Sequence, residues 1–202
     1  PVNRAIVVNL PTSSGKTLIA EFKILQALNQ FNGEGWIAYV APTRALVNQI
    51  TTRLKKDLSN DPLNIRIEKM SGALEIDSFE EAKIESDSFD ILVTTPEKLN
   101  LLVRQNVDEK LGKSLVLVIA DEAHNLEDSD RGLALELLLS NIQNDCAKAN
   151  FLLLTPFIPN AEQVARWLDP EHPKSISIGL EWQPNERVIG MFYPTIISNG
   201  NS

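Results

Sequence analysis

Short apolar runs rich in β-branched residues alternate with amphipathic stretches along most of this chain, and this alternation constrains its fold more than any other feature. Strands of a parallel sheet are buried on both faces and therefore read as continuous apolar runs. The pattern predicts βαβ units, and so an α/β fold with a mostly parallel central sheet and helices on both faces. The predicted strands span residues 5–9, 36–41, 64–69, 90–94, 115–120, 150–155 and 175–178.

Apolar residues at spacings of three and four between these runs predict helices with one buried face. One such set is Leu18, Phe22, Leu25 and Leu28, and another is Leu46, Ile50, Leu54 and Leu58. The segment 132–142 is apolar nearly throughout, so we expect that helix to be buried on more than one side. Asn160, with Gln163 three residues later, predicts a capping arrangement for a short helix that ends near Trp167.

The chain has 202 residues, of which 43% are apolar, and this is the size of one globular domain with a substantial core. It contains no repeat of fixed period and no Gly/Ser linker, so we expect residues 1–202 to form a single domain. The longest continuous apolar runs, such as 115–120, are far shorter than the roughly 20 residues of a membrane span. We therefore expect no membrane partner.

The net charge of −8 argues against a broad basic surface that would bind nucleic acid without specificity. Any contact with nucleic acid must be local, from backbone amides, helix N-termini and a few cations. The single Cys146 cannot form an intrachain disulfide, and no secretory leader opens the chain. We expect an intracellular location, cytoplasmic or, in a eukaryote, nuclear.

The segment 10–17 reads Leu-Pro-Thr-Ser-Ser-Gly-Lys-Thr between a predicted strand and a predicted helix, which is the context of a phosphate-binding loop. Such a loop points backbone N–H groups at phosphate oxygens, and the helix N-terminus adds a favourable dipole. Lys16 would reach the terminal phosphates of ATP, and the Thr17 hydroxyl would ligate Mg²⁺. A plain turn is the alternative, and Leu10 stands where the general pattern has glycine. The candidate nucleotide-binding residues are Pro11, Thr12, Ser13, Ser14, Gly15, Lys16 and Thr17.

A second motif follows the apolar run 115–120, which ends in Asp121 and Glu122. Sheets of α/β proteins place their chemistry at the carboxyl ends of strands. Asp121 is positioned to hold Mg²⁺, through water, and Glu122 to orient or deprotonate the water that attacks the γ-phosphate. A solvated acidic loop would explain the pair alone, but the phosphate loop upstream favours an ATP site with Lys16, Asp121 and Glu122 as catalytic residues.

These two motifs together resemble the first motor lobe of superfamily two helicases. Residues 41–46 are similar to motif Ia of that family, 71–72 to its glycine motif and 94–98 to its motif Ib. Arg131-Gly132 with Glu136, and residues 158–162 before Trp167, resemble the DExH subgroup that includes exosome-associated RNA helicases and archaeal DNA-repair helicases. The resemblance covers residues 5 to about 182, with the motifs in the family's order. It implies a RecA-like P-loop NTPase fold that uses ATP and Mg²⁺.

The resemblance also implies that Thr43, Arg44, Gly72 and Thr95 contact the sugar-phosphate backbone of single-stranded DNA or RNA, without reading its sequence. Each has a simpler interpretation. Thr43 and Thr95 can be helix caps, Gly72 a turn residue and Arg44 a solvated cation. Their shared order along the chain favours the nucleic-acid role.

The family links ATP hydrolysis to strand movement through the fourth residue of its Asp-Glu-Ala-His motif, here His124, and through a Ser-Ala-Thr motif. In this chain the latter reads Thr155-Pro156-Phe157. Thr155 keeps one hydroxyl, whereas Pro156 removes a backbone donor and Phe157 replaces the second hydroxyl with a ring. This departure questions the efficiency of the motor more than ATP binding.

The resemblance assigns residues 1–202 to one ATP-binding lobe, with the adenine motif upstream and the second RecA-like lobe both outside this chain. Because that second lobe carries the arginine fingers, we expect weak nucleotide binding and negligible turnover by the chain alone. Three functions remain open. The first is the ATP-binding lobe of a helicase or translocase, the second a non-catalytic adaptor with a helicase-like fold, and the third a P-loop ATPase that acts on protein or small molecules.

Overall fold

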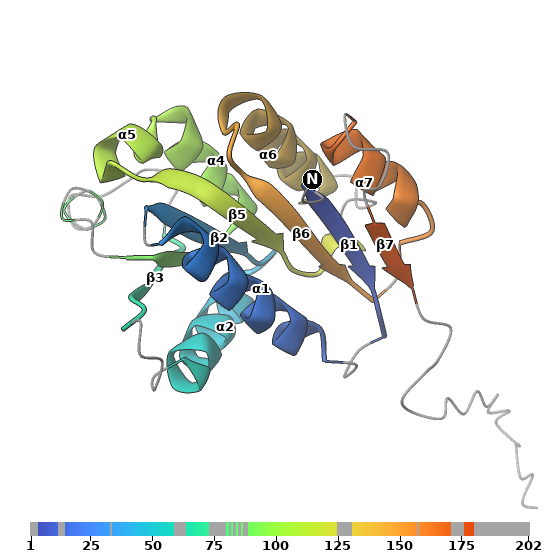
Figure 1. Ribbon diagram of the computed structural model, residues 1–202, viewed down its shortest axis with the longest axis horizontal. Helices are drawn as coiled ribbons and strands as arrows, with labels where there is room; N and C mark the ends of the chain where they lie inside the picture. Colours follow the sequence, from blue (N-terminus) through green and yellow to red (C-terminus); the bar gives the residue numbers. More distant parts are fainter. Residues whose placement is uncertain are drawn as a thin grey trace, which may run out of the picture.

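Seven strands form a single parallel sheet in the computed structural model (Figure 1). The structure describes residues 4–11, 15–32, 34–58, 64–72, 80, 82, 84, 86, 89–124, 131–156, 158–170 and 176–179. The strand order is β3-β4-β2-β5-β6-β1-β7, and each neighbouring pair is parallel. The predicted α/β fold is confirmed, and this sheet is parallel throughout.

Each predicted strand has a counterpart in the sheet. Two of them, β1 and β6, have the predicted bounds. The strands are β1 Ala5–Asn9, β2 Gly35–Val40, β3 Ile67–Met70, β4 Ile91–Thr94, β5 Ser114–Ala120, β6 Asn150–Thr155 and β7 Ile176–Gly179.

Strand β3 differs from the prediction because it begins three residues later than expected. Asn64 has φ 50°, in the left-handed region that strands do not use. The Arg66 backbone N–H donates to Asp90 Oδ2 at 3.0 Å instead of to a neighbouring strand. A side chain therefore takes the Arg66 N–H out of the sheet ladder, although the Arg66 carbonyl still accepts from the backbone N–H groups of Asp90 and Ile91.

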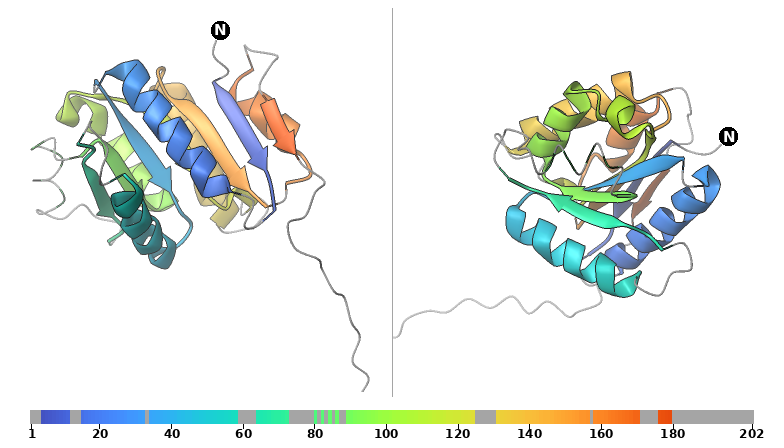
Figure 2. Two further views of the ribbon diagram at one scale, coloured as in Figure 1. Left: turned by 60° about the horizontal axis from the view of Figure 1, so that its bottom comes forward. Right: turned by 90° about the vertical axis from the view of Figure 1, so that its left-hand side faces the viewer.

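Helices cover both faces of the sheet, as predicted (Figure 2). Helices α1 and α2 pack on one face, and α4, α5, α6 and α7 pack on the other. Their bounds are α1 Lys16–Phe31, α2 Arg44–Asp57, α4 Pro96–Arg104, α5 Val107–Leu111, α6 Arg131–Asp145 and α7 Ala161–Leu168. Each layer buries its own apolar cluster against the sheet.

The predicted buried face of α1 is wrong in its first half. Leu18 and Phe22 are 52% and 65% exposed, whereas Ala20, Ile24 and Ala27 are buried. Helix α1 carries two apolar rows, and the row with small alanines faces the sheet, where it allows close approach of the helix. Periodicity alone does not separate two such rows.

Helix α6 also differs from its prediction, since it is not buried on more than one side. Leu133 and Leu137 are 57% and 50% exposed, while Leu135, Leu138 and Leu139 are buried. In α7, Asn160 is the N-cap residue, but its side chain makes no capping hydrogen bond, so the predicted capping arrangement is wrong. None of the described helices is long and apolar enough to cross a membrane.

Candidate functional site

The carboxyl ends of the parallel strands bring together residues that are far apart in sequence. Three backbone hydrogen bonds of 2.9 Å fasten the segments that leave the sheet there: Leu10 N to Thr155 O, Ala41 N to Thr94 O, and Asp121 N to Val40 O. The predicted phosphate loop, the predicted carboxylates and the predicted strand-binding residues all follow strands at this edge. These residues lie close together because all strands of a parallel sheet have their carboxyl ends at the same edge.

The phosphate loop enters α1 through Gly15, which has φ 87° and serves as the N-cap. That left-handed conformation suits glycine and strains other residues. Leu10 is buried in the apolar cluster on the α1 and α2 side of the sheet, which explains how a side chain fits where the general pattern has glycine. Thr12, Ser13 and Ser14 lie outside the described residues.

Lys16 folds back over its own loop. Its Nζ donates to the carbonyls of Leu10 at 2.9 Å and Pro11 at 3.2 Å. Both acceptors are neutral, so the ammonium keeps a net charge that a phosphate could take up. Thr17, the next residue, lies in the first turn of α1.

Asp121 is a half-buried carboxylate with a hydrogen bond to each oxygen. Its Oδ1 accepts from the Glu122 backbone N–H at 2.9 Å, and its Oδ2 accepts from the Tyr39 hydroxyl at 3.1 Å. Burial raises the pKa of Asp121 above its ordinary value, although the Glu122 N–H bond lowers it in part. Burial, assisted by the negative charge of Asp121, raises the pKa of Tyr39 well above its ordinary value. The Tyr39 hydroxyl therefore stays protonated and acts as a donor.

Glu122 adopts φ 54°, which is uncommon for a residue other than glycine. Backbone strain of this kind concentrates at functional sites. His124 Nδ1 lies 3.1 Å from Glu122 Oε2. The structure thus brings the predicted coupling residue His124 beside the predicted catalytic carboxylate.

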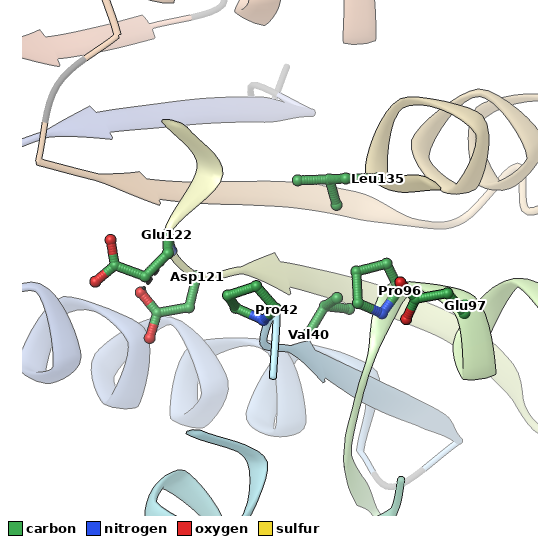
Figure 3. A pocket seen from close by; sticks show the side chains of 7 residues that line it. All are labelled: Val40, Pro42, Pro96, Glu97, Asp121, Glu122 and Leu135. Carbon is green, nitrogen blue, oxygen red and sulfur yellow. Dashed lines mark hydrogen bonds between the residues drawn. The ribbon is translucent and has the colours of Figure 1, made fainter. Parts of the chain in front are cut away.

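A small pocket opens beside the two carboxylates (Figure 3). The Asp121 and Glu122 side chains lie next to each other, close to Pro42. The pocket is lined by Val40, Pro42, Pro96, Glu97, Asp121, Glu122 and Leu135.

A second pocket, of about 260 Å³, contains all four predicted strand-binding residues. We call it the strand groove. Its lining consists of Pro42, Thr43, Arg44, Gly72, Thr95, Glu97 and Lys98. The Arg44 guanidinium donates to the Gly72 carbonyl at 3.2 Å and so joins α2 to the loop after β3.

The two threonines of the groove are helix caps, as their simpler interpretation predicts. Thr43 Oγ1 accepts from Leu46 N at 3.3 Å at the start of α2. Thr95 Oγ1 accepts from Lys98 N at 3.5 Å at the start of α4. A hydroxyl that accepts one hydrogen bond can still donate another, so capping leaves each threonine able to contact a phosphate.

Two side-chain contacts at this edge are not predictable from the sequence. Lys98 is only 2% exposed and its ammonium pairs with Glu80, so it is not a solvated cation of the groove. Tyr39 contacts Asp121 across 82 residues of sequence. No local spacing relates either pair, and only the folded sheet reveals them.

The predicted coupling motif after β6 is only partly described. Thr155 is buried, and its carbonyl accepts from Leu10 at the base of the phosphate loop. Pro156 follows it, whereas Phe157 lies outside the described residues. Thr155 thus contacts the loop through its backbone.

The chain matches the DEAD/DEAH box helicase family over residues 2–164. It is 31% identical over 177 residues to the DExH-box ATP-dependent RNA helicase DExH14 of Arabidopsis thaliana, covering 82% of this chain and 8% of that protein. It is 32% identical over 188 residues to the ATP-dependent DNA helicase Hel308 of Thermococcus kodakarensis, covering 93% of this chain and 15% of that protein.

Among solved structures, the fold is similar to the Hef helicase domain of Pyrococcus furiosus, with a TM-score of 0.63, 22% identity and coverage of 87% of this chain and 36% of that one. It is also similar to the helicase MrfA bound to DNA, with a TM-score of 0.66, 20% identity and coverage of 86% and 24%. These structural likenesses show the RecA-like fold of helicase domains. The chain spans between 8% and 24% of the length of six curated relatives that it matches.

Proposed function

Because this chain belongs to the DEAD/DEAH box helicase family, we propose that it is the ATP-binding lobe of an ATP-dependent helicase, which hydrolyses ATP with Mg²⁺ and holds single-stranded nucleic acid. One observation carries the proposal. Lys16, Asp121 and Glu122 lie at the same sheet edge as a groove that contains Thr43, Arg44, Gly72 and Thr95. In this proposal residues 1–202 form a single lobe, and turnover requires the second RecA-like lobe of a longer parent chain.

ATP would bind where the loop meets α1. Residues 11–17 would surround the phosphates, with backbone N–H groups from residues 12–17 and the N-terminus of α1 directed at them. Lys16 would exchange its two carbonyl partners for phosphate oxygens, which are stronger acceptors because they are charged.

The residues present fit Mg²⁺. Asp121 is a carboxylate whose burial disfavours its charge, so a bound cation would stabilise its ionised form. Thr17 and Asp121 would hold the ion, and Mg²⁺, when bound, would neutralise charge on the phosphates. Glu122 would orient the attacking water or take its proton, with His124 beside it.

Nucleic acid would bind in the strand groove by its sugar-phosphate backbone. Arg44 is exposed there, whereas Lys98 is paired with Glu80 and Glu97 adds a negative charge. The charged side chains of the groove therefore nearly cancel. This agrees with the prediction, made from the net charge of −8, that the chain has no broad basic surface. Contacts would come mainly from hydroxyls and backbone groups, which suit DNA and RNA alike. Such a lobe would work in the cytoplasm or, in a eukaryote, the nucleus.

The second candidate function is a non-catalytic adaptor that retains the helicase fold. The observation that favours it is Pro156, which stands in the coupling motif directly after the buried Thr155. Lys16, Asp121 and Glu122 favour the enzyme. The third possibility, an ATPase that acts on protein or small molecules, is disfavoured by the family.

Calorimetry of ATP binding with Mg²⁺, on this chain and its Lys16→Ala variant, tests the proposal. The expected result is weak binding that the substitution abolishes, because the ammonium is the main charge offered to the phosphates. A single-stranded oligonucleotide should bind both proteins equally. ATP binding that is equal in both proteins would contradict the assigned site. The lack of ATP binding by either protein would mean that the upstream adenine motif is required or that the lobe is an adaptor, and the catalytic assignments would then be withdrawn.

A further inference from the structure

Tyr39 lies on β2, an inner strand of the sheet, and is fully buried in the apolar cluster beneath α1 and α2. Its hydroxyl nevertheless reaches the functional edge, where it donates to Asp121 Oδ2 at 3.1 Å. The only polar atom of this side chain is therefore directed at the carboxylate assigned to Mg²⁺.

We propose that Tyr39 is a positioning residue that fixes the orientation of the Asp121 carboxylate for Mg²⁺. The inference rests on the proposed function, because it assumes that Asp121 holds the ion. Glu122 N–H holds Oδ1, and the Tyr39 hydroxyl holds Oδ2, so the two donors together set the rotation of the carboxylate. Each oxygen still has a further lone pair for a water of the ion.

The backbone makes the arrangement rigid. Strands β2 and β5 are paired in register, with Tyr39 opposite Ile119 and Val40 opposite Ala120. Asp121 N then donates to Val40 O at 2.9 Å, which fixes the carboxylate's own backbone against the strand that carries Tyr39. The donor therefore lies in the ladder, and the acceptor is the first residue after β5, held to β2 by a backbone hydrogen bond.

In the proposed site the Tyr39 hydroxyl belongs to the outer shell, because it contacts the Asp121 carboxylate and not the ion. Outer-shell donors of this kind orient a metal ligand and affect metal affinity without touching the ion.

A simpler interpretation is that a buried hydroxyl takes the nearest acceptor, with no consequence for the ion. The Tyr39→Phe substitution separates the two because it removes one oxygen and keeps the ring. Positioning predicts that the Mg²⁺ concentration that half-saturates ATP binding rises about 10-fold, at the lower end of the effect of outer-shell partners. ATP affinity in the presence of EDTA should stay unchanged, which a general loss of structure would not permit.

Two further variants complete the experiment. Thr51→Val removes another buried hydroxyl, one that donates to Val47 O within α2, and should leave the Mg²⁺ dependence unaltered. Asp121→Asn should abolish the Mg²⁺ dependence and tests the proposed function itself. An unchanged Tyr39→Phe beside a defective Asp121→Asn overturns the positioning role alone. If both variants match the unmodified chain, the metal assignment fails too.

A second measurement keeps the Tyr39 hydroxyl in place and so does not depend on the stability of the Tyr39→Phe variant. The chain has two tyrosines, so 3-fluorotyrosine labels only Tyr39 and Tyr193, and Tyr193→Phe leaves a single ¹⁹F signal. Addition of Mg²⁺ to the ATP-bound chain should shift this signal, and the shift should disappear in Asp121→Asn. A ¹⁹F signal that ignores Mg²⁺ while ATP binding depends on Mg²⁺ would contradict the proposal.

Discussion

The edge that we propose to bind ATP and the strand groove lie side by side at one end of the sheet, but they are built differently. At the first, Lys16 donates to the neutral carbonyls of Leu10 and Pro11, and Glu122 occupies a left-handed backbone conformation. In the groove, Thr43 and Thr95 cap helices, and Lys98 is buried against Glu80. In the proposed function, the first region is specialised for chemistry, whereas the second uses structural residues as its binding surface.

The buried Lys98–Glu80 pair gives the largest expected effect on folding. Lys98→Met leaves a buried carboxylate without its cation, so we expect the free energy of unfolding to fall by about 3 kcal/mol. Urea denaturation followed by circular dichroism measures it. The matched control is Lys55→Met, which breaks an ion pair on the surface at 3.9 Å from Glu68 and should cost less than about 1 kcal/mol. An equal decrease in the free energy of unfolding for the two variants would contradict a structural role of the Lys98–Glu80 pair.

Removal of the Thr95 helix cap should have a smaller effect on stability and should also weaken single-strand binding. Thr95→Ala should lower the free energy of unfolding by about 1 kcal/mol and weaken single-strand binding as well, because the same hydroxyl serves both. Thr95→Ser keeps the hydroxyl and should restore both. Loss of stability with normal strand affinity would leave Thr95 as a cap only.

Arg44→Ala should reduce the salt dependence of single-strand binding. The free energy of unfolding should stay nearly unaltered, since Arg44 is exposed. Removing one phosphate contact should reduce the slope of log affinity against log salt by about 0.7. Binding of a fluorescent single-stranded oligonucleotide at several salt concentrations gives this slope. An unchanged slope would show that Arg44 only tethers the Gly72 loop.

The sequence predicts the strands well and the facing of the helices less well. Strands 5–9 and 150–155 match because buried parallel strands are unbroken apolar runs between polar ends. Helix α1 misleads because both its rows are apolar, and the choice between them depends on how closely small alanines let the helix approach the sheet. The start of β3 depends on Asp90, which bonds the Arg66 backbone from 24 residues away.

The candidate site follows the same division. Lys16, Asp121 and the groove threonines stand in local motifs directly after strands, so sequence reasoning finds them. The Tyr39–Asp121 and Glu80–Lys98 contacts join side chains from different elements and leave no local spacing. Their detection needs the register of β2 against β5 and the position of α4, which are properties of the fold.

In the proposed function, this sheet edge couples ATP hydrolysis to the binding of a single strand. The most direct test is the ATPase rate of the longer parent chain that this function requires, with and without single-stranded DNA or RNA, beside its Glu122→Gln variant. We predict a rate that the strand stimulates in the parent and that falls by about 10²- to 10³-fold in the variant, because the attacking water loses its base. A rate that ignores both the strand and the Glu122→Gln substitution would contradict the account.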